Sequence, residues 1–236
     1  MTIYAFIPFR SGSSRLKNKN IKVIKKRPLV YWTVKIAILN SKIDKVILST
    51  DSKKYYNKVI YFLKKDRISS KKIIFDKREK KFSNSKFKIF DYVKKILTKK
   101  IYFSKKDLIV QMLPTLPLRS KKFVTKCINF SLKKKMNVFS ANEYDFHISF
   151  AFFLTQNFKW KNVLKNTPMK NGNTRGQDQK KAYHPNGLVN CVWYKNLLKN
   201  KYKTYYFNAL PVISPKYMSF DIDNVEDFQF LKKLIH

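Results

Sequence analysis

The first half of the chain contains two kinds of hydrophobic pattern in regular succession. Short apolar runs predict buried strands at Ile3–Pro8, Lys45–Ser49, Ile73–Phe75 and Leu108–Leu113. Between them, apolar residues recur every three or four positions, which predicts helices at 28–39, 55–63, 87–97 and 121–132. Strands alternating with helices of this length predict a doubly wound, mostly parallel sheet, a Rossmann-like three-layer α/β/α fold.

The apolar positions also predict which helix faces are buried and where the last helix starts. In the first helix, which Pro28 opens, the expected buried face is Leu29, Trp32, Ile36 and Leu39, with Lys35 on the other side. The last helix is expected to begin at Asn224, with Asp227 three residues later as its capping-box partner.

The second half has a different rhythm. After about residue 140, strand-like aromatic segments at Ile148–Leu154 and Leu188–Tyr194 stand on either side of a polar stretch from Asn166 to Lys181. We therefore expect a single domain over residues 1–236 with a small inserted lobe at about 141–182.

Size and composition restrict the class of protein. The 236 residues, 44% of them hydrophobic, suffice for one large core. Since no apolar run approaches the roughly 20 residues of a membrane span and no secretion-signal pattern is seen, we expect a cytoplasmic protein without a membrane partner. Cys127 and Cys191 have no metal-type spacing, so both are expected to be small buried hydrophobes.

The net charge of +38 first suggests a phosphate-rich partner such as nucleic acid. However, the 52 basic residues are nearly all lysines scattered from end to end, with arginine at only seven positions. We interpret this as compositional drift and expect no nucleic-acid partner. A basic nucleic-acid binder stays a rival hypothesis, and RNA affinity that falls steeply with salt would support it.

Ligands of α/β sheets bind beyond the carboxyl ends of the strands, so the loops there are the candidate sites. The loop after the first strand, RSGSSRLKNKN, contains Arg10, Gly12, Ser13, Arg15 and Lys19. Gly12 allows a backbone turn that other residues resist, Ser13 and backbone amides can donate to phosphate oxygens, and the cations can neutralise a triphosphate. The alternative is a solvated basic loop.

Three later loops also contain candidate residues. Ser49-Thr50-Asp51 ends the second strand, where Thr50 or Asp51 could equally cap the next helix. In PTLPLR, Arg119 ends a loop stiffened by two prolines, which can hold backbone groups against a base; Arg119 could also be a surface charge. The segment GQDQKKAYHPNG contains two of the four glycines and the candidates Gln177, Asp178, Tyr183, His184 and Asn186, although a lone histidine is often structural and Pro-Asn-Gly is often a turn.

The segment SFDIDNVED concentrates acidic residues in a basic chain. Glu226 and Asp227 are explained as residues of a helix start. Asp221 and Asp223 lie two residues apart, which in an extended segment places both carboxylates on one face. Such a pair of oxygen ligands suits Mg²⁺ bound together with substrate phosphates; salt bridges to lysines are the alternative.

Taken together, IPFRSGSSRLKNKN, VILSTD, PTLPLR, QD followed by YHPNG, and SFDID resemble the acylneuraminate cytidylyltransferase (CMP-sialic acid synthetase) family, over almost the whole chain. The resemblance implies a sheet of the nucleotide-diphospho-sugar transferase type and transfer of CMP from CTP to a nine-carbon sugar acid (sialic, legionaminic or pseudaminic), with release of pyrophosphate. It also implies a homodimer formed through the late lobe.

The resemblance also implies roles for individual residues. Arg10, Ser13 and Lys19 match positions that face the CTP phosphates, Gly12 and Arg15 lie in the same loop, and Arg78 matches an arginine after the third strand. Thr115 and Arg119 match positions near the base or the sugar acid, and Gln177, Tyr183, His184 and Asn186 lie in the segment expected at the sugar acid. Asp221 and Asp223 match the Mg²⁺ ligands, and Arg10, Lys19 and Asp221 are the candidate catalytic residues.

Some positions depart from the family pattern. Most relatives have lysine in place of Ser14, glutamine in place of Leu113 and aspartate in place of Ser85. Arg15 and Gln111 are the candidate replacements for the first two. These departures keep two alternatives open, a catalytically weakened relative that binds nucleotides, and a nucleotidyltransferase for another sugar acid or a sugar phosphate.

Overall fold

The computed structural model describes residues 1–13, 15–83, 88–173, 175–199 and 205–234. Its central sheet has seven strands in the order β11-β7-β10-β6-β1-β4-β5. The strands are β1 Ile3–Pro8, β4 Lys45–Thr50, β5 Ile73–Lys77, β6 Leu108–Gln111, β7 Val138–Glu143, β10 Tyr183–Trp193 and β11 Leu210–Ile213. Only β10 runs antiparallel to its neighbours, β6 and β7, so the predicted mostly parallel sheet is confirmed.

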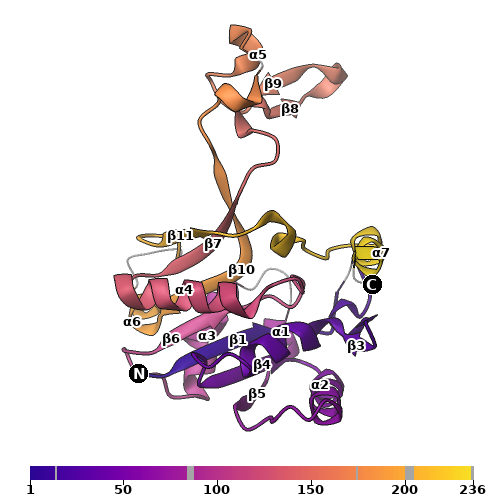
Figure 1. The fold of residues 1–236 in the computed structure, drawn as a ribbon, viewed down its shortest axis with the longest axis vertical. Coiled ribbons are helices and arrows are strands. Elements are labelled where there is room, and N and C mark those ends of the chain that lie inside the picture. The colour runs from indigo at the N-terminus through magenta and orange to yellow at the C-terminus, as the bar shows by residue number, and fades with distance from the viewer. Residues whose placement is uncertain (14, 84–87, 174, 200–204, 235–236) are drawn as a thin grey trace.

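Helices cover both faces of this sheet (Figure 1). They are α1 Leu29–Ile38, α2 Lys53–Lys65, α3 Ile89–Lys95, α4 Lys121–Lys134, α5 Pro168–Asn171, α6 Tyr194–Leu198 and α7 Val225–Leu234. Two pairs of short strands complete the described elements, β2 Val23–Ile24 with β3 Arg27–Pro28, and β8 Phe152–Leu154 with β9 Trp160–Asn162.

Alternate residues of the strands point to opposite layers, and this produces two cores. Ala5 and Ile7 of β1 pack with α1, α2 and α4 on one face of the sheet. Phe6, between them, packs with α3 on the other face. A third cluster joins Phe228 and Leu231 of α7 to Leu16 in the loop after β1. The end of the chain is therefore packed against the first loop (Figure 1).

The segment between β7 and β10 projects away from the sheet (Figure 1). It spans residues 144–182 and contains β8, β9 and α5. The large side chains of β8 and β9 are exposed, among them Phe153, Leu154 and Trp160. We call residues 144–182 the projecting segment.

The alternating elements predicted for the first 134 residues are present, with shifted ends. The third helix, expected at 87–97, is shorter than predicted. It starts at Ile89 and ends at Lys95, and a 3₁₀ turn, Leu97–Lys99, follows; Phe87 lies outside the described residues. The capping box of α7 is confirmed, because Asn224 Oδ1 accepts from Asp227 N (2.8 Å) and Asp227 Oδ2 accepts from Asn224 N (3.0 Å). Cys127 and Cys191 are buried and unpaired, as predicted.

Several predictions about the elements are wrong. Strands β7 and β11 were not expected, and only Phe152–Leu154 of the predicted strand 148–154 is extended. In α1 the buried face is centred on Val30, Val34 and Ala37, whereas Leu39 is 49% exposed. The reason is that α1 contributes to two hydrophobic clusters, the main core and the cluster with α7. The apolar stripe therefore does not mark a single buried face. No helix in the described part of the chain is long and apolar enough to span a bilayer.

Candidate active site

The carboxyl ends of β1, β4 and β5 are tied together by hydrogen bonds. Ser11, in the loop after β1, donates from its amide (2.8 Å) and from its hydroxyl (2.7 Å) to the carboxylate of Asp51 after β4. The amide of Arg78, after β5, donates to Thr50 O at 2.9 Å. The predicted capping role of Thr50 or Asp51 is wrong, since the cap of α2 is Ser52, whose Oγ accepts from Tyr55 N. Asp51 instead fixes the loop after β1.

The basic loop after β1 lies at this sheet edge. Arg10 is partly buried, and its Nη1 donates to Ser83 O at 3.0 Å, while its own carbonyl accepts from Asn20 Nδ2 at 2.9 Å. The predicted need for a glycine at position 12 is wrong, because Gly12 has no positive φ and open space where a Cβ would be. The amide of Ser13 donates back to Ser11 O. Ser14 lies outside the described residues.

The acidic segment near the C-terminus folds back onto this loop. Lys19 Nζ donates to Ile222 O (2.8 Å) and to Asp223 Oδ1 (3.0 Å), and Arg15 Nη1 lies 3.0 Å from Asp223 Oδ2. Asp221 is exposed, with its pKa raised because nearby protein atoms desolvate the carboxyl and Asp223 repels its charge, against hydrogen bonding from Thr115 and attraction by Lys19. The structure thus brings Arg15 and Lys19 of the basic loop onto the segment that contains Asp221 and Asp223.

The loop after β6 connects the same segment to the sheet. Thr115 O accepts from Ile222 N at 2.9 Å. Arg119 is only 3% exposed, and it donates from Nε to Leu188 O (2.8 Å), from Nη1 to Thr33 Oγ1 (2.9 Å) and from Nη2 to Leu113 O (2.9 Å). Burial lowers the pKa of Arg119 to about 9. The alternative of a surface charge is wrong, because all three nitrogens donate to protein acceptors that lock the loop.

The predicted sugar-acid residues are divided between two places. Tyr183, His184 and Asn186 lie on β10, where Asn186 Nδ2 donates to Asn142 Oδ1 and to Ser214 Oγ (2.8 Å). The ring of His184 packs 4.7 Å from that of Tyr144. The alternative that Pro-Asn-Gly is only a turn is wrong, since β10 runs through it with an irregular register between Pro185 and Asn190.

Gln177 is the predicted site residue that lies apart. It is exposed in the 3₁₀ turn Gly176–Asp178 of the projecting segment, together with Asp178. Figure 1 shows this segment standing clear of the central sheet. Within one copy of the chain, Gln177 does not join the residues at the ends of the strands.

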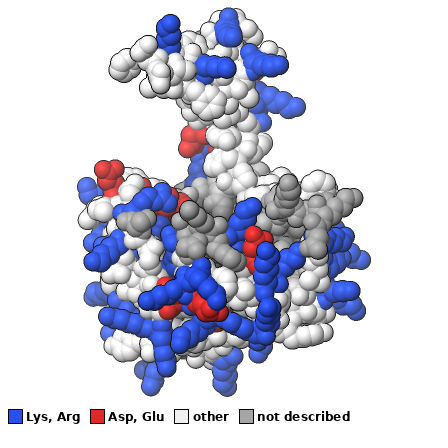
Figure 2. All heavy atoms as spheres, turned by 180° about the vertical axis from the view of Figure 1, so that it is seen from behind, with Lys and Arg blue, Asp and Glu red and all other residues white. Residues whose placement is uncertain are grey.

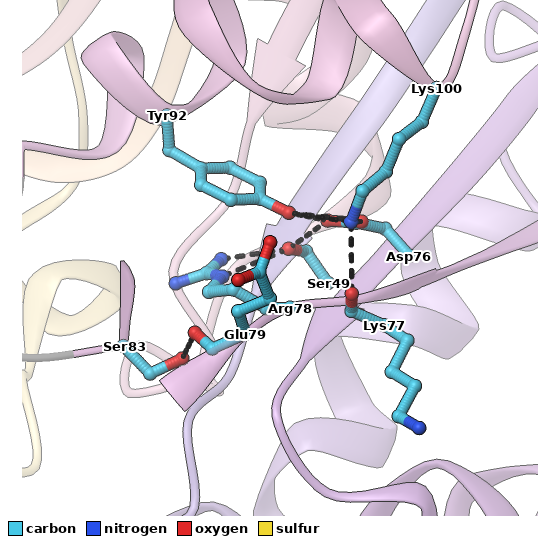
Figure 3. Close-up of polar contacts among 8 residues, drawn as sticks. All are labelled: Ser49, Asp76, Lys77, Arg78, Glu79, Ser83, Tyr92 and Lys100. Carbon is cyan, nitrogen blue, oxygen red and sulfur yellow. Dashed lines mark hydrogen bonds and ion pairs between the residues drawn. The ribbon is translucent and has the colours of Figure 1, made fainter. Parts of the chain in front are cut away.

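A buried polar network surrounds Arg78 (Figure 3). Arg78 is 4% exposed and donates from Nε (3.1 Å) and Nη2 (2.8 Å) to Ser49 Oγ. Ser49 Oγ in turn donates to Asp76 Oδ2 at 2.6 Å, and the carboxylate of Asp76 also accepts from Tyr92 Oη and Lys100 Nζ. Burial lowers the pKa of Arg78 and raises that of Tyr92. Arg78 and Ser49 lie in segments that were candidates from the sequence, whereas Asp76, Tyr92 and Lys100 were not predicted to belong to the site.

Comparisons with known proteins agree with this arrangement. The cytidylyltransferase family model matches residues 4–234. The chain belongs to the cytidylyltransferase family. It is 26% identical over 240 residues to the pseudaminic acid cytidylyltransferase of Campylobacter jejuni serotype O:2, covering 97% of this chain and 94% of that one. It is 25% identical over 241 residues to the N-acylneuraminate cytidylyltransferase of Escherichia coli O18:K1:H7, covering 96% of this chain and 50% of that one.

Solved structures share the fold of this cytidylyltransferase. A CMP:2-keto-3-deoxy-manno-octonic acid synthetase complexed with CTP superposes with a TM-score of 0.66 at 12% identity, covering 100% of this chain and 98% of that one. The 4-diphosphocytidyl-2C-methyl-D-erythritol synthase of Anaerococcus prevotii gives a TM-score of 0.64 at 15% identity, covering 99% of this chain and 98% of that one. Together with the sheet order, these matches establish the predicted Rossmann-like α/β fold.

Of the acidic pair of this cytidylyltransferase, Asp223 has the salt bridges that were the alternative to a metal, with Arg15 and Lys19 (both 3.0 Å), and Asp221 is the carboxylate that a divalent cation could join. Asp221 is exposed, no ion pair to its carboxylate is recorded among the described residues, and repulsion from Asp223 contributes to its raised pKa. A divalent cation would relieve that repulsion. No cluster of three or more His, Cys, Asp or Glu side chains occurs in the part of the chain that the structure describes, so phosphates and water would have to complete the coordination.

Part of the cytidylyltransferase site could be found only in three dimensions. Asp76, Tyr92 and Lys100 come from β5, α3 and the residue after a 3₁₀ turn, and no spacing in the sequence relates them to Arg78. Separately, a cavity of about 680 Å³ lies between α3, α6 and residues 205–208. Gln111 reaches this cavity from the end of β6, whereas Leu113 packs against Gly187.

Proposed function

We propose that this cytidylyltransferase transfers CMP from CTP to a nonulosonic acid and releases pyrophosphate. The observation that carries the proposal is the similarity over 97% of the chain to a pseudaminic acid cytidylyltransferase. A second pseudaminic acid enzyme of Campylobacter jejuni, from serotype O:23/36, is 24% identical over 230 residues. Pseudaminic acid is therefore the first substrate to try, followed by N-acetylneuraminic and legionaminic acids.

In this proposal the triphosphate lies along the loop after β1. Arg10, Arg15 and Lys19 belong to that loop and Arg78 follows β5, so four cations come from the carboxyl ends of neighbouring strands. The amides and hydroxyls of the loop, including Ser13, add neutral donors. Charge neutralisation and alignment are what a phosphoryl-transfer reaction requires from a protein.

The reaction is a single displacement at the α-phosphorus. The anomeric hydroxyl oxygen of the sugar acid forms a bond to the α-phosphorus, and the bond from that phosphorus to the bridging oxygen breaks, which releases pyrophosphate. Asp221 and Asp223 would hold Mg²⁺, which when bound neutralises the phosphate charge. The exposed Asp221 carboxylate, or a water beside it, is the acceptor that we propose for the hydroxyl proton.

The sugar acid would lie towards β10. Tyr183, His184 and Asn186 follow one another on this strand, and the loop containing Thr115 and Arg119 packs beside it through Gly187 and Leu188. Gln177 can reach a site only in another copy of the chain or after a large movement of the projecting segment.

The test is pyrophosphate release from each of the four nucleoside triphosphates with Mg²⁺ and each of the three nonulosonic acids. We expect release with CTP and at least one acid, and a loss of more than about a hundredfold in Asp221→Ala or Asp223→Ala. Glu226→Gln is the matched control, because Glu226 is an exposed acid of the same segment. Release with none of the acids would contradict the proposal, and CTP binding without turnover would support a catalytically weakened relative.

We also propose that two copies of the chain associate through the projecting segment. Phe152, Phe153, Leu154, Phe158 and Trp160 are all at least half exposed there, which is unusual for one short segment of a monomer. A second copy would bury them and bring Gln177 of one chain towards the partner. Sedimentation of the wild type should give a dimer and of Phe153→Asp a monomer; a monomeric wild type would contradict this.

The location that we propose is the cytoplasm, where CTP is made. The high positive charge does not favour nucleic acid, since Figure 2 shows basic side chains both on the projecting segment and in several places on the body below it instead of in one stripe. RNA binding at physiological salt would contradict this interpretation.

A further inference from the structure

Asp76 is a carboxylate buried at the end of β5, 2% exposed (Figure 3). Its oxygens accept hydrogen bonds from Ser49 Oγ (2.6 Å), Tyr92 Oη (2.7 and 3.0 Å) and Lys100 Nζ (2.9 Å). A buried carboxylate requires a cation and several donors to offset the loss of hydration. Lys100 supplies the charge, and Tyr92 and Ser49 supply the remaining donors.

Arg78 is buried beside this carboxylate but does not bond to it. Its Nε and Nη2 donate to the hydroxyl of Ser49, and its guanidinium lies 4.7 Å from the ring centre of Tyr92. A hydroxyl has one proton, so Ser49 donates to Asp76 and can only accept from Arg78. Among the described residues, no carboxylate bonds to the guanidinium and no acceptor is recorded for Nη1. A buried cation in this state is costly unless an anion joins it.

The same arginine lies at the edge where the basic loop is held. Its amide donates to Thr50 O, the residue before Asp51, and Asp51 binds Ser11 of the loop after β1. The charge of Asp51 is also among the causes that raise the pKa of Arg78 against its burial. An anion held by the loop after β1 is therefore within the electrostatic reach of Arg78.

We propose that Lys100 and Tyr92 are positioning residues that keep Asp76 from forming an ion pair with Arg78, which leaves the guanidinium for a phosphate group. Lys100 neutralises the carboxylate from the opposite side and is fixed by a further bond to Lys77 O at 2.9 Å. The hydroxyl of Tyr92 holds the same carboxylate, while its ring supports the guanidinium. That the phosphate is the triphosphate of CTP rests on the proposed function.

Removing the charge of Lys100 should change the partner of Arg78. In Lys100→Met the buried Asp76 carboxylate has lost its cation, and Arg78, which shares the Ser49 hydroxyl with Asp76, is the buried cation that can replace it. An arginine paired with Asp76 binds phosphate weakly, because the negative charge of Asp76 offsets its own. We expect the KM for CTP to rise about tenfold to a hundredfold, with the KM for the sugar acid changed less than about twofold.

The experiment compares four variants by calorimetry with CTP and with inorganic tripolyphosphate, and by steady-state kinetics. Lys99→Met is the matched control, since Lys99 is the neighbouring exposed lysine. Lys100→Arg should restore binding because it restores the cation. Tyr92→Phe keeps the ring and removes the hydroxyl, so it should weaken binding of both ligands less than Lys100→Met does.

Each outcome decides the proposal. A loss of affinity for tripolyphosphate and CTP in Lys100→Met, with rescue by Lys100→Arg, supports it. Wild-type affinity in Lys100→Met, an equal rise of both KM values, or a wild type that binds no tripolyphosphate contradicts it. If Lys100→Met does not fold, Tyr92→Phe with unchanged tripolyphosphate affinity contradicts it as well. Failure of the wild type with every sugar acid would overturn the proposed function alone, because the tripolyphosphate comparison does not depend on the acid.

Discussion

Arg78 and Arg119 each follow a strand of the same sheet and are almost equally buried, with 4% and 3% of their surface exposed. Their partners differ. Arg119 donates from each of its three nitrogens to a different part of the protein, namely Leu188 O, Thr33 Oγ1 and Leu113 O. Arg78 directs two nitrogens to the single hydroxyl of Ser49 and lies against the ring of Tyr92.

This difference separates a structural role from a binding role. The donors of Arg119 are used in joining α1, the loop after β6 and β10, which favours a structural role over the contact with the base or sugar acid that was expected from the sequence. The donors of Arg78 are held in place by the protein but are not all used. Burial alone thus does not distinguish a structural arginine from a binding one. The number of separate protein acceptors that its nitrogens contact makes the distinction.

The largest expected effect is on activity, in Arg78→Met. Without the guanidinium, kcat/KM for CTP should fall by about a hundredfold to a thousandfold, because a preorganised donor to the phosphates is lost. The free energy of unfolding should change by less than about 1 kcal/mol or increase, because a buried cation without a bonded carboxylate is removed. Kinetics and denaturant unfolding of the same sample measure both. An Arg78→Met variant with wild-type kcat/KM and a lowered free energy of unfolding would contradict the binding role of Arg78.

Arg119→Met should show the opposite pattern. Its removal leaves Leu188 O, Thr33 Oγ1 and Leu113 O without this donor in a buried environment, so the free energy of unfolding should fall by about 2–5 kcal/mol. The turnover of the molecules that stay folded should be within about tenfold of the wild type. Urea unfolding measures the stability, and a stability equal to that of the wild type would mean that Arg119 does not lock the loop.

Gly187→Ala examines the packing beside Arg119. Gly187 has a φ of 73°, and a Cβ there would lie 3.2 Å from Leu113 Cδ1, so the variant should lose about 1–2 kcal/mol of stability. Gly12→Ala is the matched control, with a change within about 0.5 kcal/mol, because Gly12 has ordinary backbone angles and open space. Equal unfolding midpoints for the two variants would contradict the close packing of β10 on the loop after β6.

The smallest effect is expected at a third arginine, Arg27, which has a carboxylate partner. Asp66 accepts from Arg27 Nε (2.8 Å) and from Tyr31 Oη, and these bonds lower the pKa of Asp66 below its ordinary value of 3.8. A carboxyl group with a lowered pKa stabilises the folded state at any pH above its ordinary pKa. This stabilisation is lost as the pH falls through the lowered pKa.

The stability advantage of the wild type over Asp66→Asn should therefore be constant near neutral pH and shrink below about pH 4. Thermal unfolding from pH 7 to pH 2 measures it. An advantage that grows on acidification would show that the pKa is not lowered.

The sequence predicted the parts of the molecule that depend on neighbours along the chain. The alternating strands and helices of the first 134 residues and the capping box of α7 follow from local patterns. Strand β7 could not be predicted, because VFSANE places polar residues at buried positions whose partners come from β10 and from the end of β11. Strand β11 is only four residues long and contains Pro211.

The candidate site was predictable to a similar degree. Asp223 lies more than 200 residues after Arg15 and Lys19 and was related to them only through the family resemblance, and the structure brings the three into contact. The set Asp76, Tyr92 and Lys100 could not be predicted, because tyrosine and lysine are common in this chain and carry no signal in isolation. Their role arises from burial around one carboxylate.

The central claim is CMP transfer from CTP to a nonulosonic acid, and phosphorus NMR of the complete reaction tests it most directly. With CTP, Mg²⁺, pseudaminic, legionaminic or N-acetylneuraminic acid and the wild-type enzyme, the three CTP resonances should give way to one phosphodiester resonance and pyrophosphate in equal amounts. CTP that stays intact with every acid, or pyrophosphate accompanied from the start by free CMP, would contradict the account.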